Sequence, residues 1–129
     1  MKQNLHAVTL VVQDYNDALA FYTERLGFQL LKDIDLGGGK RWVLITPPGS
    51  DGGGLLLAKA DGPEQRAAIG NQTGGRVGFF LQTDDFQRDY TQMRANGVHF
   101  EETPRFESYG TVAVWRDPYG NRWDLIQFT

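Results

Sequence analysis

Three side chains with chemical potential occur in segments that are otherwise mostly apolar: His6, Arg76 and Asp124. A histidine donates or accepts a proton near neutral pH. An arginine cannot bind a cation, but its planar guanidinium can hold a carboxylate, phosphonate or enolate oxygen in two-point contact. A carboxylate such as Asp124 is costly to bury unless it is paired, and Arg76 is its expected partner. If the three side chains meet, they indicate anion binding or proton transfer.

The elements that must position these residues belong to a sequence repeat. Asp14 matches Asp84, and Gly27 matches Gly97, at an offset of 70 positions in each pair. Each Asp is expected to cap a helix, because its carboxylate can accept hydrogen bonds from the free N–H groups of the first turn. Each Gly is expected to end that helix, because a C′ residue adopts a positive φ.

Each copy is predicted to fold as one strand, one helix and three further strands. The strand candidates are rich in β-branched and aromatic residues. They are residues 5–12, 28–36, 40–46 and 54–59 in the first copy and 76–82, 98–103, 110–117 and 122–128 in the second. The predicted fold class is therefore α+β. A single domain, 1–129, is expected to contain module 1 at about 4–59, a polar connector at 60–75 with one helical turn, and module 2 at about 76–129.

Two such modules are expected to form an incomplete barrel around a shared cavity, which is the default ligand site. The repeat offset makes His6 and Arg76 corresponding residues, since 76 − 6 is 70. Further side chains are candidates for ligand contact by their place in the predicted modules. They are Trp42, Gln72, Tyr109 and Trp115. The two tryptophans lie on equivalent third strands and are predicted to form walls for a flat ligand.

The amino-acid composition limits the classes of binding partner that are expected. No cysteine occurs, so disulfides and thiolate zinc sites are excluded and an intracellular, cytoplasmic location is expected. Lys and Arg total 13 against 16 Asp and Glu, without a basic block, so nucleic acid is not expected as a partner. The apolar runs are strand-sized, which predicts no membrane span. A small molecule is the expected partner.

The segments "HAVTLVVQDYNDALAFYTERLGF" and "YGTVAVWRDPYGNRWDLIQF" resemble the vicinal oxygen chelate superfamily, which includes glyoxalase I, extradiol dioxygenases and bleomycin-binding proteins. The resemblance implies a homodimer. It also implies, in metal-using members, a His on the first strand and a Glu on the last strand of each copy. His6 matches the first such position and Asp124 the last, whereas Arg76 and Leu55 or Leu56 stand at the other two. No cofactor is expected, and a divalent metal on His6 and Asp124 is the alternative.

Three functions are compatible with these residues. The first is a protein whose metal site is degraded and which binds an anionic or aromatic small molecule. The second is a metal-dependent lyase or dioxygenase of the glyoxalase I type. The third is a metal-free isomerase or lyase that uses His6 and Arg76, with Asp124, as catalytic residues.

Overall fold

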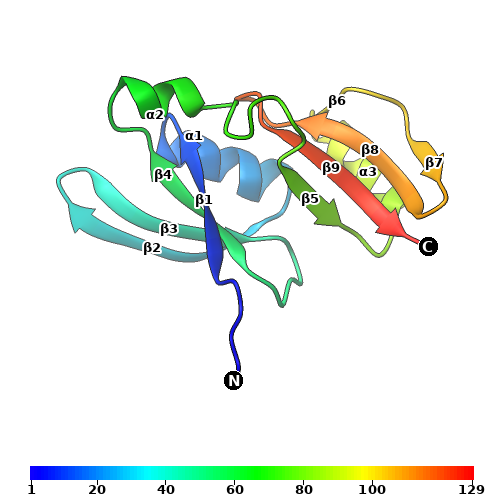
Figure 1. Ribbon diagram of the computed structural model, residues 1–129, viewed down its shortest axis with the longest axis horizontal. Helices are drawn as coiled ribbons and strands as arrows, with labels where there is room; N and C mark the ends of the chain where they lie inside the picture. The colour runs from blue at the N-terminus through cyan, green and yellow to red at the C-terminus, as the bar shows by residue number, and fades with distance from the viewer. The chain divides into compact units, whose positions relative to one another are not determined.

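The computed structural model describes residues 1–129 and divides into two compact units, Met1–Ile69 and Gly70–Thr129. Figure 1 shows that each unit contains a β-sheet with a helix against one face. The predicted α+β class is confirmed, with two sheets and no closed barrel. No helix is both long and apolar enough to cross a lipid bilayer.

The first unit has the predicted order of one strand, one helix and three strands. Its elements are β1 (Ala7–Val12), α1 (Tyr15–Leu19), η1 (Ala20–Arg25), β2 (Gln29–Gly37), β3 (Lys40–Thr46), β4 (Gly54–Lys59) and α2 (Pro63–Ala68). The sheet order is β1-β4-β3-β2, with β1 parallel to β4 and the other pairs antiparallel. The short helix α2 is the helical turn that was predicted in the connector.

A buried apolar row holds the first unit together. Leu10 on β1 lies opposite Leu57 on β4, and Leu57 lies opposite Val43 on β3. These side chains are at most 1% exposed, and Ala18 and Tyr22 of the helix are 0% exposed. Because side chains alternate between the faces of a sheet, the residues between them in each strand point to the face without the helix.

The second unit repeats the order, with one strand interrupted. Its elements are β5 (Phe79–Gln82), α3 (Phe86–Ala95), β6 (His99–Phe100), β7 (Arg105–Glu107), β8 (Gly110–Arg116) and β9 (Arg122–Phe128). The sheet order is β5-β9-β8-β6, and β7 also pairs with β8. The prediction of one strand over 98–103 is wrong beyond Phe100. Pro104 follows, and proline has no N–H to continue a ladder.

The helix boundaries confirm three of the four predicted signals. Asp14 caps the first helix by accepting a hydrogen bond from the N–H of Asp17 at 2.9 Å. Gly27 and Gly97 have positive φ angles of 76° and 85°, as predicted for residues that end helices. The prediction for Asp84 is wrong, because the next residue caps α3 in its place.

Asp85 is the cap of α3, since its carboxylate accepts a hydrogen bond from the N–H of Arg88 at 3.1 Å. We expect Asp85→Ala to lower the free energy of unfolding by about 1 kcal/mol, the usual effect of losing an N-cap side chain. Asp84→Ala is the control, because Asp84 makes only an exposed ion pair with Arg88, and it should have a clearly smaller effect. Urea denaturation of both variants measures the difference. Equal losses would contradict this cap assignment.

The two helices differ in length by one residue. Thirteen positions separate Asp14 from Gly27, and 12 separate Asp85 from Gly97 (27 − 14 and 97 − 85). The segment η1 is a π-helix, and a π-turn accommodates one residue more than an α-turn. The copies are therefore offset by 71 before the helix and by 70 after it.

This change of offset overturns the predicted correspondence between His6 and Arg76. Leu10 and Leu81 each lie opposite a leucine on the last strand of their unit, and they are 71 residues apart (81 − 10). By the same offset, the position of His6 in the second unit belongs to Val77. The exchange of an imidazole for a guanidinium at one position thus does not occur.

Candidate ligand-binding site

The face of the second sheet opposite α3 carries Asp124. In the sheet register Asp124 on β9 lies between Phe80 on β5 and Val114 on β8. The next residue, Leu125, is 0% exposed and belongs to the core beneath α3. Because strand side chains alternate, Asp124 projects from the helix-free face, which Figure 1 shows turned to the viewer with α3 behind the sheet.

One carboxylate oxygen of Asp124 has no hydrogen-bond partner. This atom, Oδ1, is buried. Burial raises the pKa of the Asp124 carboxyl above its ordinary value, while Arg105 and Arg122 lower this pKa and Glu102 raises it further. A buried acceptor without a donor destabilises a fold, typically by 1–3 kcal/mol. Oδ1 of Asp124 can therefore accept a hydrogen bond, but the second unit supplies no donor for it.

The two arginines near Asp124 are occupied by other carboxylates. Arg105 Nε donates to both oxygens of Glu102 at 2.9 and 3.1 Å, and its Nη1 donates to Glu107 at 2.9 Å. Glu102 Oε2 also accepts the N–H of Val114 at 2.9 Å. These bonds fix Glu102 and Arg105 beside Asp124 and neutralise their charges.

Arg122 is bound to Glu101 in the same way. Its Nη2 and Nε donate to the two oxygens of Glu101 at 2.9 and 3.1 Å. The Arg122 guanidinium holds the pKa of Glu101 below its ordinary value, and Arg116 adds a further bond to the same carboxylate. Asp124 consequently feels the field of Arg122 without forming an ion pair with it.

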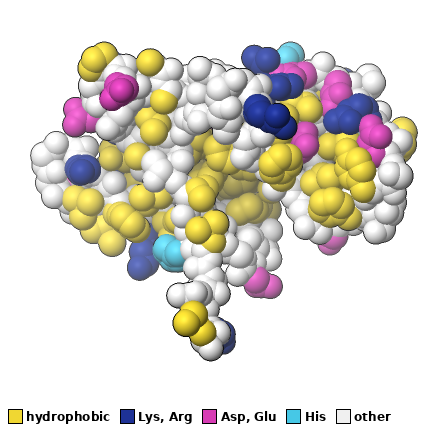
Figure 2. Space-filling model, in the orientation of Figure 1, with side chains coloured by type: hydrophobic (Ala, Val, Ile, Leu, Met, Phe, Trp, Pro, Cys, Tyr) yellow, Lys and Arg dark blue, Asp and Glu magenta, His cyan; other side chains and the backbone are white.

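Aromatic side chains are exposed around this carboxylate. Phe80 is 66% exposed and projects from the same face as Asp124. Phe128, four residues along β9 from Asp124, lies on that face and is 52% exposed. Tyr109, a predicted ligand residue in the turn before β8, is 48% exposed. Figure 2 shows hydrophobic side chains exposed over β5 and β9. This face offers aromatic surface beside an unpaired acceptor.

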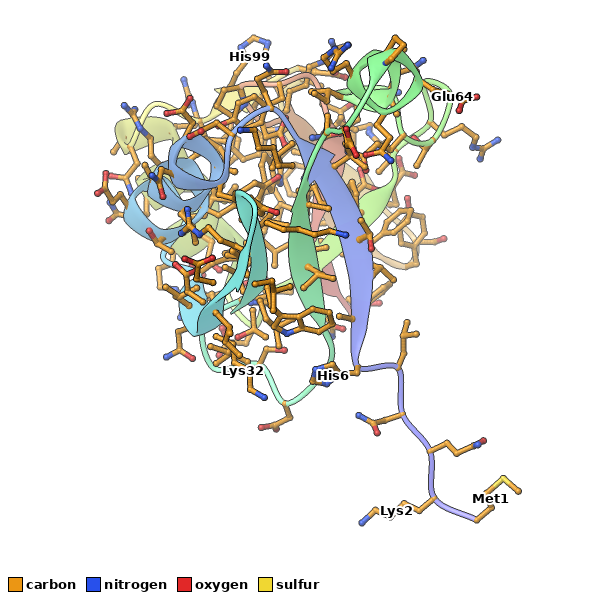
Figure 3. The ribbon with its side chains drawn as sticks, turned by 90° about the vertical axis from the view of Figure 1, so that its left-hand side faces the viewer. Met1, Lys2, His6, Lys32, Glu64 and His99 are labelled. Atoms are coloured by element: carbon orange, nitrogen blue, oxygen red, sulfur yellow. The ribbon has the colours of Figure 1, made fainter.

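The two other predicted catalytic residues lie apart from strand interiors. His6 is exposed and precedes β1, where its carbonyl accepts the N–H of Gly54 at 2.9 Å (Figure 3). Arg76 is also exposed and precedes β5. The predicted ion pair between Arg76 and Asp124 is not formed, because the charged groups that act on Asp124 are Arg105, Glu102 and Arg122.

The side chains of the structure do not provide a set of metal ligands. No three His, Asp or Glu side chains come together in an arrangement that could hold a metal ion. Catalytic zinc sites normally use three protein ligands. His6 and Asp124 alone are too few to hold a catalytic metal ion.

The two tryptophans predicted as facing walls point to opposite faces of their sheets. Trp115 is 0% exposed and stacks on Trp123, with ring centroids 5.0 Å apart. With the offset of 70, its counterpart in the first unit is the buried Ile45, whereas Trp42 lies one residue from the inward Val43 and is 37% exposed. Trp115 is thus a core residue, and Trp42 remains a candidate for ligand contact.

Gln72 lies at a different place from the Asp124 face. It is half-buried, and its Nε2 donates to Asn121 Oδ1 at 3.2 Å. It lines a hollow that also contains Arg76. The structure therefore brings together two of the predicted residues in that hollow and places Asp124 with unpredicted neighbours.

The fold and this face define a class of protein: paired βαβββ units with a surface suited to small molecules. Residues 4–125 match the family Glyoxalase/Bleomycin resistance protein/Dioxygenase superfamily. The chain belongs to this superfamily, which confirms the resemblance seen in the sequence.

Relatives cover nearly the whole chain. A protein of Shewanella frigidimarina (strain NCIMB 400), described as an uncharacterized protein, is 52% identical over 98% of this chain and 95% of its own. The crystal structure of UcmS2 has a TM-score of 0.83 and 32% identity, with 98% of each chain covered. TnmS3, an antibiotic binding protein from Streptomyces sp. CB03234, has a TM-score of 0.75 and 29% identity, with 99% of this chain and 98% of its own covered.

Proposed function

We propose that this protein binds a small molecule that carries an aromatic ring system and a hydrogen-bond donor, on the helix-free face of the second sheet. The observation that carries the proposal is the buried, unpaired Oδ1 of Asp124. A hydroxyl or N–H group of the ligand supplies the missing donor once the carboxylate turns outward, because Oδ1 is closed to solvent in the unliganded protein. Phe80, its neighbour in the sheet, supplies exposed aromatic surface for the ring.

The similarity to TnmS3 supports the same class of function, since that protein is an antibiotic binding protein. An antibiotic that carries an aromatic ring and a hydroxyl or N–H group is the ligand type that suits Asp124 and Phe80. Catalysis by His6 and Arg76 has no comparable support, because both lie outside the strands and neither acts on Asp124.

A matched pair of probes tests the proposed donor. We expect 2-naphthol to bind about tenfold more tightly than 2-methoxynaphthalene, because only the phenol donates to Asp124 and a hydrogen bond to a charged group contributes about 1.5–3 kcal/mol. NMR titration measures both affinities. The preference should disappear in Asp124→Leu, whereas Phe80→Ala should weaken both probes. A phenol preference that survives in Asp124→Leu would exclude Asp124 as the acceptor.

A further inference from the structure

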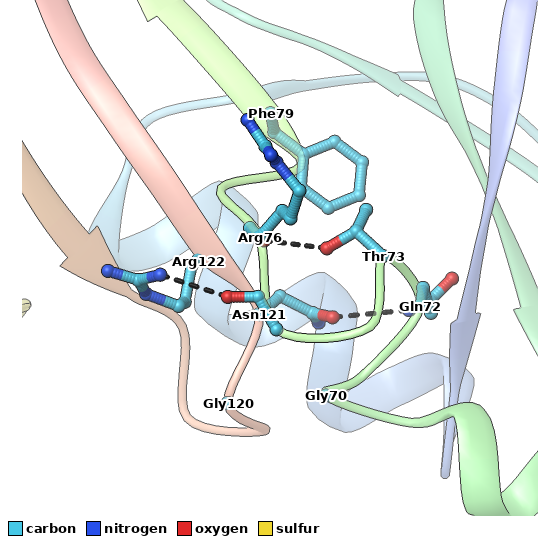
Figure 4. Close-up of a pocket in the computed structure, with 9 residues that line it drawn as sticks. Gly70, Gln72, Thr73, Arg76, Phe79, Gly120, Asn121 and Arg122 are labelled. Carbon is cyan, nitrogen blue, oxygen red and sulfur yellow. Dashed lines mark hydrogen bonds between the residues drawn. The ribbon is translucent and has the colours of Figure 1, made fainter.

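The hollow lined by Gln72 and Arg76 lies before the start of β5, where the segment 70–76 folds against the turn between β8 and β9 (Figure 4). Gly70 approaches this turn so closely that a Cβ atom would lie 2.0 Å from the carbonyl oxygen of Tyr119. The bond from Gln72 to Asn121 and a bond from Arg122 Nη1 to the carbonyl of Gly75 at 3.0 Å fasten the segment. The hollow is therefore built from fixed backbone.

Arg76 is held at the rim of this hollow. The hydroxyl of Thr73 donates to the carbonyl of Arg76 at 2.6 Å. Gly78 packs closely against Thr73, because a Cβ atom there would lie 2.6 Å from Cγ2 of Thr73 and would force it to shift. The ring of Phe79 also lines the hollow (Figure 4). That ring stacks on Trp123, with centroids 4.8 Å apart. The wall of the hollow at Phe79 is thus anchored to the core.

The charge of Arg76 is not neutralised by the protein. Four other arginines of the second unit form ion pairs with Asp or Glu, namely Arg88, Arg105, Arg116 and Arg122. Arg94 lies over the ring of Tyr90, 5.3 Å from its centroid. Arg76 has no ion pair, and its hydrogen bond with Thr73 involves the backbone carbonyl alone. Its five N–H donors are available to a ligand.

The lining of the hollow favours an anion. It includes Arg76, Arg122, Gln72, Thr73 and Asn121, and it contains no carboxylate. The space open to a water-sized atom is about 20 Å³. This is near the room that one water molecule requires, so the hollow admits a single small polar group and excludes an aromatic ring.

We propose that this hollow is an anion subsite in which Arg76 binds a carboxylate or phosphate group. The guanidinium presents two parallel N–H donors, which match two oxygens of either group. The site is separate from the Asp124 face, because none of its lining residues is Phe80, Asp124 or Val114. The protein has a net charge of −3, so it does not attract anions by its overall charge. Anion binding therefore requires a specific site.

Amide NMR of the full chain tests the subsite by separate titrations with inorganic phosphate and acetate at constant ionic strength. We expect saturable shifts at the amides of residues 72–76 with at least one of the two anions. Arg76→Gln should weaken this binding by about tenfold, because the charged two-point contact is lost, and Arg76→Lys should weaken it less. Phosphate and acetate affinities show which group the site prefers.

Arg66→Gln is the matched control, because Arg66 is an exposed arginine on α2 that loses the same charge. It should bind the preferred anion as the wild type does. Shifts that fail to saturate with both anions, or equal weakening in the Arg76 and Arg66 variants, would overturn the subsite. Neither result bears on phenol binding at Asp124.

Discussion

Replacing Asp124 with leucine is expected to stabilise the unliganded protein at pH 7 by about 1 kcal/mol. The reason is that the substitution removes a buried acceptor without a donor, which costs about 1–3 kcal/mol. The lower figure applies because the side chain is only partly buried and solvent screens its charge. Leucine suits the position, since Leu56 occupies it in the first unit. Urea denaturation of both proteins measures the change. If the protein becomes more stable when Asp124 is replaced but loses ligand binding, the role of Asp124 is in binding and not in stability.

The pH dependence of this difference has a definite sign. Burial raises the pKa of Asp124 in the folded state, so the unfolded chain releases this proton at lower pH than the folded protein does. The penalty is therefore absent below the unfolded pKa, roughly 4, grows as the pH rises through the folded pKa, and is constant above it. Asp124→Asn, which keeps the size without the charge, should remove the same pH-dependent part. A penalty that grows on acidification would contradict this account.

The architecture was predictable because local signals mark its boundaries. Asp14, Gly27 and Gly97 mark helix ends by hydrogen bonding and positive φ, both of which are properties of single residues and their neighbours. Asp124 was predictable as a candidate site residue because it is a carboxylate within an apolar strand. These inferences need no knowledge of which strands pair.

The sequence did not show as clearly which face of its strand each residue occupies. The segment "RVGFFLQ" is almost continuously apolar, so no alternation separates Phe79 from Phe80. Phe80 was therefore missed, although it lies beside Asp124 in the sheet. The π-helix η1 was also hidden, because one extra residue in an apolar helix leaves no turn signal. That residue shifted the predicted strand correspondence by one position.

The partners of Asp124 depend on contacts between distant segments. Arg105 belongs to the short strand β7, which follows a break at Pro104 that sequence patterns did not place. Its charge is taken by Glu102 and Glu107. A signal was present in the spacing "EETPRFE", where carboxylates lie three residues before and two after Arg105. The sequence prediction instead paired the aspartate with Arg76.

Gly70→Ala is expected to be among the most destabilising single substitutions in the segment that carries Arg76. Gly70 has a φ of +73°, which costs a side-chain-bearing residue about 1–2 kcal/mol. The added Cβ would also lie 2.0 Å from the carbonyl oxygen of Tyr119, and backbone cannot move aside as a flexible side chain does. Overpacking of this kind costs about 1–3 kcal/mol. The expected total is therefore about 3 kcal/mol, measured by urea denaturation.

Gly74→Ala separates the two contributions. Gly74 has a similar φ of +68°, but a Cβ atom there would meet nothing within 4 Å. Its substitution should therefore cost only the conformational part, about 1–2 kcal/mol. Equal losses in the two variants would show that the approach of Gly70 to Tyr119 does not hold the segment. If the close approach does hold it, Gly70→Ala should also weaken anion binding at Arg76 more than Gly74→Ala does, because the bonds from Gln72 and Arg122 depend on the same backbone path.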